Sequence, residues 1–180
     1  MSALERDPVM QAVLRACIEG TTATAGWVVR GGASPHVVEA SFSSPEIRAV
    51  ELESSLAAMV LASGSPAALT DIRASHGFAL EERVLGAQPR ALLCVPCVDA
   101  EGQVVAAIEL ADPDGDSFTF DDIELVTLLA GVGAAALQTY ARHTDPQVLE
   151  AQQAYQKIEL GAPNVATALA NLMQILSDHV

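Results

Sequence analysis

The most reactive side chains in this sequence are the thiols of Cys94 and Cys97, which form a Cys-Val-Pro-Cys motif. Such a pair can act as a redox couple or as half of a zinc site. Here the motif lies in an apolar run, Ala91 to Val98, that predicts a strand, and three residues of strand separate two Cα atoms by about 10 Å. That separation exceeds the roughly 7 Å limit for a disulfide, and the odd spacing directs the two side chains to opposite faces. We therefore predict buried, structural cysteines, and the sequence holds no second CxxC or CxxH pair for zinc.

Two further motifs resemble ligand-binding loops but lack residues that those loops need. Asp112-Pro-Asp114-Gly-Asp116 alternates carboxylates like a calcium loop, but Ser117 replaces the required glycine and Ile123 the bidentate glutamate. Gly131-Val-Gly133-Ala-Ala-Ala136 matches a dinucleotide-binding pattern, but a Rossmann unit needs further strands, and no strand is expected after residue 112. The sequence thus predicts an acidic turn, a helix rich in small residues, and neither a metal nor a cofactor.

Glu109 is an acid within an apolar run. In a strand it shares one face with Val105 and Ala107, so its carboxylate must be paired, protonated, or turned toward a cavity or interface. The four histidines show no HxxxH or HExxH spacing, and there is no GxSxG, Walker loop or pair of catalytic acids. We therefore expect a binding residue at Glu109 and no catalytic residues.

Helix-start residues and alternating apolar runs predict a mixed order of helices and strands. Asp7 and Pro8 suit the start of a first helix and Gly20 the residue after its end, while Ser44-Pro45-Glu46 suits the start of a second. Thr119 and Asp122 open a long helix, and the turn Asp99 to Gly102 joins two apolar strands. The expected helices cover residues 8–19, 46–62, 78–85, 119–142, 146–159 and 165–177, and the expected strands 25–30, 37–42, 67–72, 91–98 and 103–111.

The helix over 119–142 carries two apolar stripes, and one sheet can cover only one of them. The segment over 144–180 adds two short amphipathic helices that are too short to be stable alone. They must dock within the chain or across a two-fold axis, and we favour a homodimer. The expected interface residues are Leu128, Val132, Ala135, Leu169, Leu172 and Leu176.

Composition and net charge indicate what kind of protein this is and which partners it disfavours. The chain has 180 residues, of which 51% are hydrophobic and 18% charged, which suits one globular domain with an appendage. The net charge of −14 opposes binding to nucleic acid or to an anionic membrane surface. Three cysteines, an odd number, and an N-terminus without signal-peptide character predict a cytoplasmic protein.

Three pieces of this sequence together resemble the GAF domains, a family of ligand-sensing and dimerisation modules. They are Ala68-Leu-Thr-Asp71-Ile, then Leu92-Leu-Cys-Val-Pro96 followed by Gly102 to Leu110, and Phe118-Thr-Phe-Asp-Asp122-Ile-Glu-Leu125. The resemblance covers roughly residues 8 to 142. It implies an α+β fold of the GAF/PAS-like kind, in which an antiparallel sheet of five or six strands is flanked by helices. We expect this domain over 1–143 and a C-terminal helical extension over 144–180.

The resemblance also implies a function. In the family the irregular stretch after the third strand lies near the ligand cavity, so Asp71, Arg73 and His76 join Glu109 as expected ligand-binding residues. We expect a non-enzymatic sensory module that binds an unknown small molecule, forms a homodimer, and acts on a separate effector protein. Two alternatives stay open: a thiol-based redox sensor or sulfoxide-reducing enzyme, and a ligand-free dimerisation scaffold.

Overall fold

The computed structural model describes residues 8–32, 36–42, 49–52, 55–72 and 89–144, with side chains described up to residue 139. The chain divides into two compact units, Met1–Leu137 and Gln138–Val180. The helices are α1 (Pro8–Thr21), α2 (Leu56–Ser63) and α4 (Phe120–Thr144). The strands are β1 (Ala25–Arg30), β2 (His36–Phe42), β3 (Ala49–Val50), β4 (Ala67–Thr70), β5 (Ala91–Val98) and β6 (Val104–Ala111).

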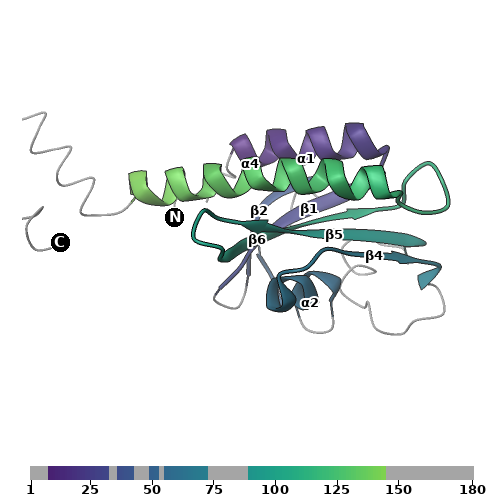
Figure 1. Cartoon of the computed structure of the whole chain (residues 1–180), viewed down its shortest axis with the longest axis horizontal. Helices are drawn as coiled ribbons and strands as arrows, with labels where there is room; N and C mark the ends of the chain where they lie inside the picture. Colours follow the sequence, from purple (N-terminus) through teal and green to yellow (C-terminus); the bar gives the residue numbers. More distant parts are fainter. Residues whose placement is uncertain (1–7, 33–35, 43–48, 53–54, 73–88, 145–180) are drawn as a thin grey trace, which may run out of the picture. The chain divides into compact units, whose positions relative to one another are not determined.

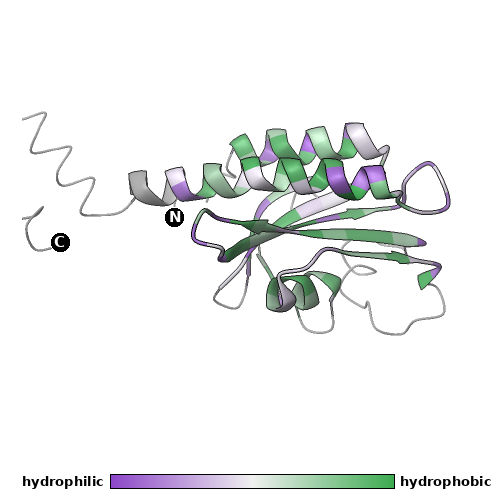
Figure 2. Ribbon diagram, in the orientation of Figure 1, coloured by the Kyte–Doolittle hydropathy of each residue, from purple (hydrophilic) through white to green (hydrophobic). Residues whose placement is uncertain are grey.

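The strands form one antiparallel sheet of six, in the order β3-β2-β1-β6-β5-β4. Helices α1 and α4 lie side by side over one face of this sheet, and α2 lies under the other face (Figure 1). The central strands β5 and β6 are hydrophobic along most of their length (Figure 2). This arrangement confirms the expected α+β fold, because central strands covered on both faces need apolar side chains on both.

The two faces of the sheet hold separate apolar cores. The α1/α4 side contains Leu14 and Cys17 of α1, Val126 and Ala130 of α4, and Ile108 of β6. The α2 side contains apolar residues of α2 and of the sheet: Leu56, Ala57, Val60, Trp27, Val29, Leu92, Cys94, Ala107 and Ala111. Successive residues of β5 and β6 therefore alternate between the cores, as the period of a strand requires.

Hydrogen bonds in the structure confirm the predicted turn between β5 and β6 and the predicted start of α4. The Asp99 carboxylate accepts from the backbone N–H of Gln103 at 2.7 Å, and Gly102 has φ +80° in the turn between β5 and β6. At the start of α4 the Thr119 hydroxyl accepts from the Asp122 N–H, and the Asp122 carboxylate accepts from the Thr119 N–H. This reciprocal pair is the predicted capping box.

The expected continuous helix over 46–62 is wrong, and its predicted start at Ser44-Pro45-Glu46 lies outside the described residues. Ala49 pairs with Val37 in the sheet, so the chain is extended where the helix was expected. The helix begins at Leu56 instead, where the Ser55 hydroxyl accepts from the Ala58 N–H and donates to the Leu52 carbonyl. Ser55 is the N-cap that the sequence analysis missed.

The sequence predicts that Gly20 comes directly after the first helix, but Gly20 lies inside that helix. The helix continues to Thr21, and Thr22 takes the left-handed conformation, with φ +55°, that ends it. A Cβ at Gly20 would collide with the Leu125 side chain, so this glycine allows α4 to approach α1 closely. The strand expected over 67–72 ends at Thr70, because Asp71 has φ +52°. The helices predicted over 78–85, 146–159 and 165–177 lie outside the described residues.

Candidate functional site

Three buried side chains that can take part in hydrogen bonding form a row across the centre of the sheet on its α2 side. Trp27 of β1 pairs directly with Glu109 of β6, and Glu109 pairs directly with Cys94 of β5. Directly opposed residues of antiparallel strands share a face and lie about 5 Å apart at their Cβ atoms. The relative exposure is 2% for Trp27 and 0% for both Glu109 and Cys94. We call Trp27, Glu109 and Cys94 the buried row.

The surroundings of the buried row are apolar. Leu56, Ala57 and Val60 of α2 belong to the same core as Trp27 and Cys94, together with Ala107 and Ala111 of β6. The indole Nε1 of Trp27 is buried and has no hydrogen-bond partner among the described residues. A buried N–H without an acceptor costs about 1–3 kcal/mol, so this atom marks a place where an acceptor is needed. An apolar enclosure with a few convergent polar groups is typical of small-molecule sites.

Of the predicted ligand-binding residues, Glu109 lies in this enclosure. Asp71 is exposed, at the end of β4, and is not part of the α2-side core. Arg73 and His76 lie outside the described residues. The sequence analysis missed Trp27 and Cys94 as neighbours of Glu109, because only the pairing of strands distant in the sequence brings them together.

The cysteines lie as their spacing predicted. Cys97 belongs to the core on the α1/α4 side and Cys94 to the core on the α2 side, and all three cysteines are thiols rather than disulfides. Burial raises the pKa of Cys17 to about 12. Burial also raises the pKa of Cys97 to about 12, and the neighbouring Cys17 adds to that shift. Thiols with such pKa values are poor nucleophiles, because the thiolate is the reactive form.

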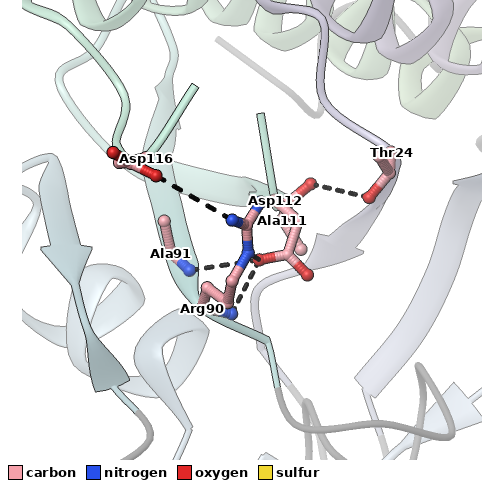
Figure 3. Close-up of polar contacts among 6 residues, drawn as sticks. All are labelled: Thr24, Arg90, Ala91, Ala111, Asp112 and Asp116. Carbon is pink, nitrogen blue, oxygen red and sulfur yellow. Dashed lines mark hydrogen bonds and ion pairs between the residues drawn. The ribbon is translucent and has the colours of Figure 1, made fainter. Parts of the chain in front are cut away.

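The acidic turn after β6 has a structural role at the corner where β1, β5 and β6 meet (Figure 3). The Asp112 carboxylate accepts from the backbone N–H groups of Arg90 at 2.7 Å and of Ala91 at 3.2 Å. The Arg90 guanidinium lies 4.0 Å from Asp112 and from Asp116. Across the described ranges, no three His, Cys, Asp or Glu side chains are grouped so that they could hold a metal ion.

Several apolar or small residues of α1 and α4 are exposed. Leu128 is 74% exposed, Val132 is 56% exposed, and Val9 of α1 is 46% exposed. Ala12 and Ala16 of α1 and Gly131 and Ala135 of α4 are exposed as well. We call these seven residues the outer helix face. They include three of the six predicted interface residues, whereas Leu169, Leu172 and Leu176 lie outside the described residues. None of the helices in the described part of the chain is long and apolar enough to span a membrane.

Comparison with known proteins agrees with this architecture. The family model described as GAF domain matches residues 3–138. A search of curated protein sequences found no significant match.

Several solved structures share the fold. A type II free methionine-R-sulfoxide reductase from Thermoplasma acidophilum superposes with a TM-score of 0.61 at 13% identity, over 72% of this chain and 90% of that one. The GAF domain of a phosphoenolpyruvate-protein phosphotransferase from Coxiella burnetii gives 0.61 at 16% identity, over 74% and 82%. A GAF domain/HD domain protein from Geobacter sulfurreducens gives 0.59 at 18% identity, over 73% and 90%. At these identities the likeness concerns the fold alone.

Proposed function

The chain belongs to the GAF domain family, and from this premise we propose that it is a regulatory module. It binds a small molecule on the α2 side of its sheet and signals to an effector protein through paired helices. The observation that carries the proposal is the buried row, in which an indole N–H lies beside a carboxylate inside an apolar core. The Trp27 N–H is costly to bury without an acceptor, and a ligand can supply one.

The strand β6 supplies a physical link between the ligand side and the helices. Glu109 faces the α2 side, while its neighbours Ile108 and Leu110 pack in the core beneath α1 and α4. A shift of β6 by a bound ligand therefore changes the surface on which both helices rest, since packed cores transmit small displacements. Binding on one side of the sheet is in this way coupled to the helices on the other.

We propose that the signal leaves the domain through helices α1 and α4, which pair with the same helices of a second copy of the chain. The outer helix face is apolar, and small residues on it allow close approach of another helix. Acidic chains with a net charge of −14 repel one another, so copies can meet only where the surface is poor in acids. We place the protein in the cytoplasm, a reducing compartment that suits its buried thiols.

Sedimentation equilibrium tests this pairing. We expect the intact chain to be a dimer at micromolar concentration and the Leu128→Gln/Val132→Gln variant to be a monomer. Met59→Gln is the matched control, because Met59 is 51% exposed but lies on α2. A variant dimer as tight as the wild type would contradict the assignment, and loss of the dimer only on removal of residues 144–180 would move the interface there.

One alternative function has an observation in its favour. Cys94 lies in the buried row beside Glu109, where a bound molecule would meet it, and two of the structural neighbours are free methionine-R-sulfoxide reductases. Incubation with free methionine-R-sulfoxide and dithiothreitol separates the two functions. Turnover that is lost in Cys94→Ala would favour the enzyme, and absence of turnover favours the regulatory module. A ligand-free scaffold is a further alternative, and a titration of the intact chain with candidate small molecules, followed by the emission of Trp27, the only tryptophan of the chain, tests it.

A further inference from the structure

The exposed stripe of α4 is acidic at one end and apolar or small along the rest. All the acids of α4 lie in its first five residues. Residues three and four apart share one face of a helix. The exposed residues at this spacing are Asp121, Glu124, Leu128, Gly131 and Ala135. The α4 part of the outer helix face therefore continues, toward the start of the helix, into two exposed acids.

Helix α1 adds a third acid at the same end. The end of α1 contacts the start of α4, because a Cβ on Gly20 would collide with the Leu125 side chain, and the two helices lie side by side (Figure 1). Glu19 is exposed at this end of α1, and Arg15, exposed one turn earlier, offsets one of the charges. We call the three exposed acids the acidic end: Glu19, Asp121 and Glu124.

The acidic end distinguishes the two ways in which identical faces can pack. The two-fold axis of such a dimer runs either along the helices or across them. An axis along the helices brings the two acidic ends together, since packed helices lie about 8–10 Å apart. An axis across them, midway between Leu128 and Ala135, places the two copies of Asp121 about 30 Å apart along α4. Because salt screens charges beyond about 10 Å at 0.1 M, the acidic ends repel strongly only in the first arrangement.

On the premise of the proposed function, in which two copies pair through the outer helix face, we propose that their α4 helices pack antiparallel. The two-fold axis crosses α4 between Gly131 and Val132. Leu128 of each copy then lies opposite Ala135 of the other, so that a large side chain meets a small one. The C-terminal ends of the two α4 helices point in opposite directions. An effector therefore meets each copy separately and does not read one continuous pair of parallel helices.

A distance between two nitroxide labels measures the orientation. Phe120 begins α4 and is 71% exposed, and the three native cysteines are fully buried, so a label on intact Phe120→Cys protein attaches to the introduced thiol. In the antiparallel dimer we expect double electron–electron resonance to give about 30–45 Å between the labels. Parallel helices would give less than about 25 Å. The same label in the Leu128→Gln/Val132→Gln variant is the control, in which we expect the signal between copies to disappear.

A pair of charge variants tests the orientation without a label. Glu124→Gln removes one charge from the acidic end, and Glu101→Gln removes the same charge from the exposed turn between β5 and β6. Sedimentation equilibrium at about 20 mM NaCl, where screening is weak, gives the dissociation constant of each dimer. In the antiparallel dimer both variants change only the net charge, so we expect their dissociation constants to agree within about threefold.

The outcomes separate the orientation from the pairing itself. A label distance below about 25 Å, or a Glu124→Gln dimer more than about threefold tighter than the Glu101→Gln dimer, would overturn the antiparallel orientation and leave the pairing intact. A monomeric intact chain would contradict the pairing. A distance above about 45 Å, or a signal that persists in the Leu128→Gln/Val132→Gln variant, would place the interface on another surface and overturn both.

Discussion

At the scale of single residues, Asp112 has an unfavourable backbone conformation that is offset by the hydrogen bonds of its side chain. Its φ of +49° lies in the left-handed region, which asparagine and aspartate tolerate better than alanine. Its carboxylate accepts from the first backbone N–H groups of the β5 segment (Figure 3). The residue is therefore specified by both its conformation and its side chain.

Substitution of Asp112 by alanine is expected to destabilise the protein by about 2 kcal/mol, because two hydrogen bonds are lost and the φ angle suits alanine poorly. Asp112→Asn is the matched control, since asparagine keeps an acceptor oxygen and tolerates the same φ, and we expect it to cost less than half as much. Urea unfolding followed by circular dichroism measures both values. Equal costs for the two variants would contradict this role of Asp112.

The buried thiols make the stability sensitive to alkaline pH. The pKa of Cys17 and of Cys97 is about 12 in the folded protein, against 9.0 for an ordinary thiol. Above pH 9 the unfolded chain loses these protons while the folded chain keeps them, so the free energy of unfolding falls as pH rises. Well below pH 9 both states hold the protons and the contribution is constant.

We expect the free energy of unfolding to fall by about 3 kcal/mol between about pH 9 and 10.5 because of these two thiols. Urea titrations at several pH values measure the slope, and the Cys17→Ala/Cys97→Ala variant corrects for other groups that titrate in this range. The decline should be shallower in the variant. An equal decline in both proteins would show that the thiols do not titrate as stated.

At the scale of elements, glycines decide how closely helices and strands approach. A Cβ on Gly26 of β1 would lie 2.9 Å from the Glu109 carbonyl oxygen and 3.2 Å from Ile18 Cδ1. A Cβ on Gly131, by contrast, would meet nothing within 4 Å. Substitution by alanine is therefore expected to have opposite effects on stability at these two positions.

Gly26→Ala is expected to destabilise the protein by about 1–3 kcal/mol through overpacking against β6 and α1. Gly131→Ala is expected to stabilise the monomer by up to about 1 kcal/mol, because alanine is the better helix former. Thermal unfolding at low protein concentration measures both. Destabilisation of the monomer by Gly131→Ala would contradict the open space around this position.

The sequence predicted those elements whose signals are local. The β5–β6 turn and the capping box of α4 depend on residues within four positions of one another, and both are confirmed. The helix expected over 46–62 failed because Ala49 pairs with Val37 of another strand, a contact that no local signal predicts, and the helix starts only after Ser55. The pairing of Trp27 with Glu109 was missed for the same reason, since β1 and β6 are distant in the sequence and adjacent only in the sheet.

At the scale of the whole molecule, the net charge of −14 opposes any self-association, whereas the apolar outer helix face favours it. Salt screens the repulsion within about 10 Å at 0.1 M ionic strength and leaves apolar contact largely unaffected. We therefore expect the dimer to tighten at least about threefold between about 20 mM and about 500 mM NaCl. Sedimentation equilibrium across this range measures the change. A dimer that weakens with salt would indicate an interface held by ion pairs instead.

The short outer strands of the sheet limit how large an assembly can become. In the described part of the chain, the sheet ends at β3 with two residues on one side and at β4 with four residues on the other. A long exposed edge strand invites further chains to add to the sheet without limit, and short edges discourage this. A chain that is half hydrophobic can therefore associate through a helical surface that closes on itself, with little tendency to grow into fibrils.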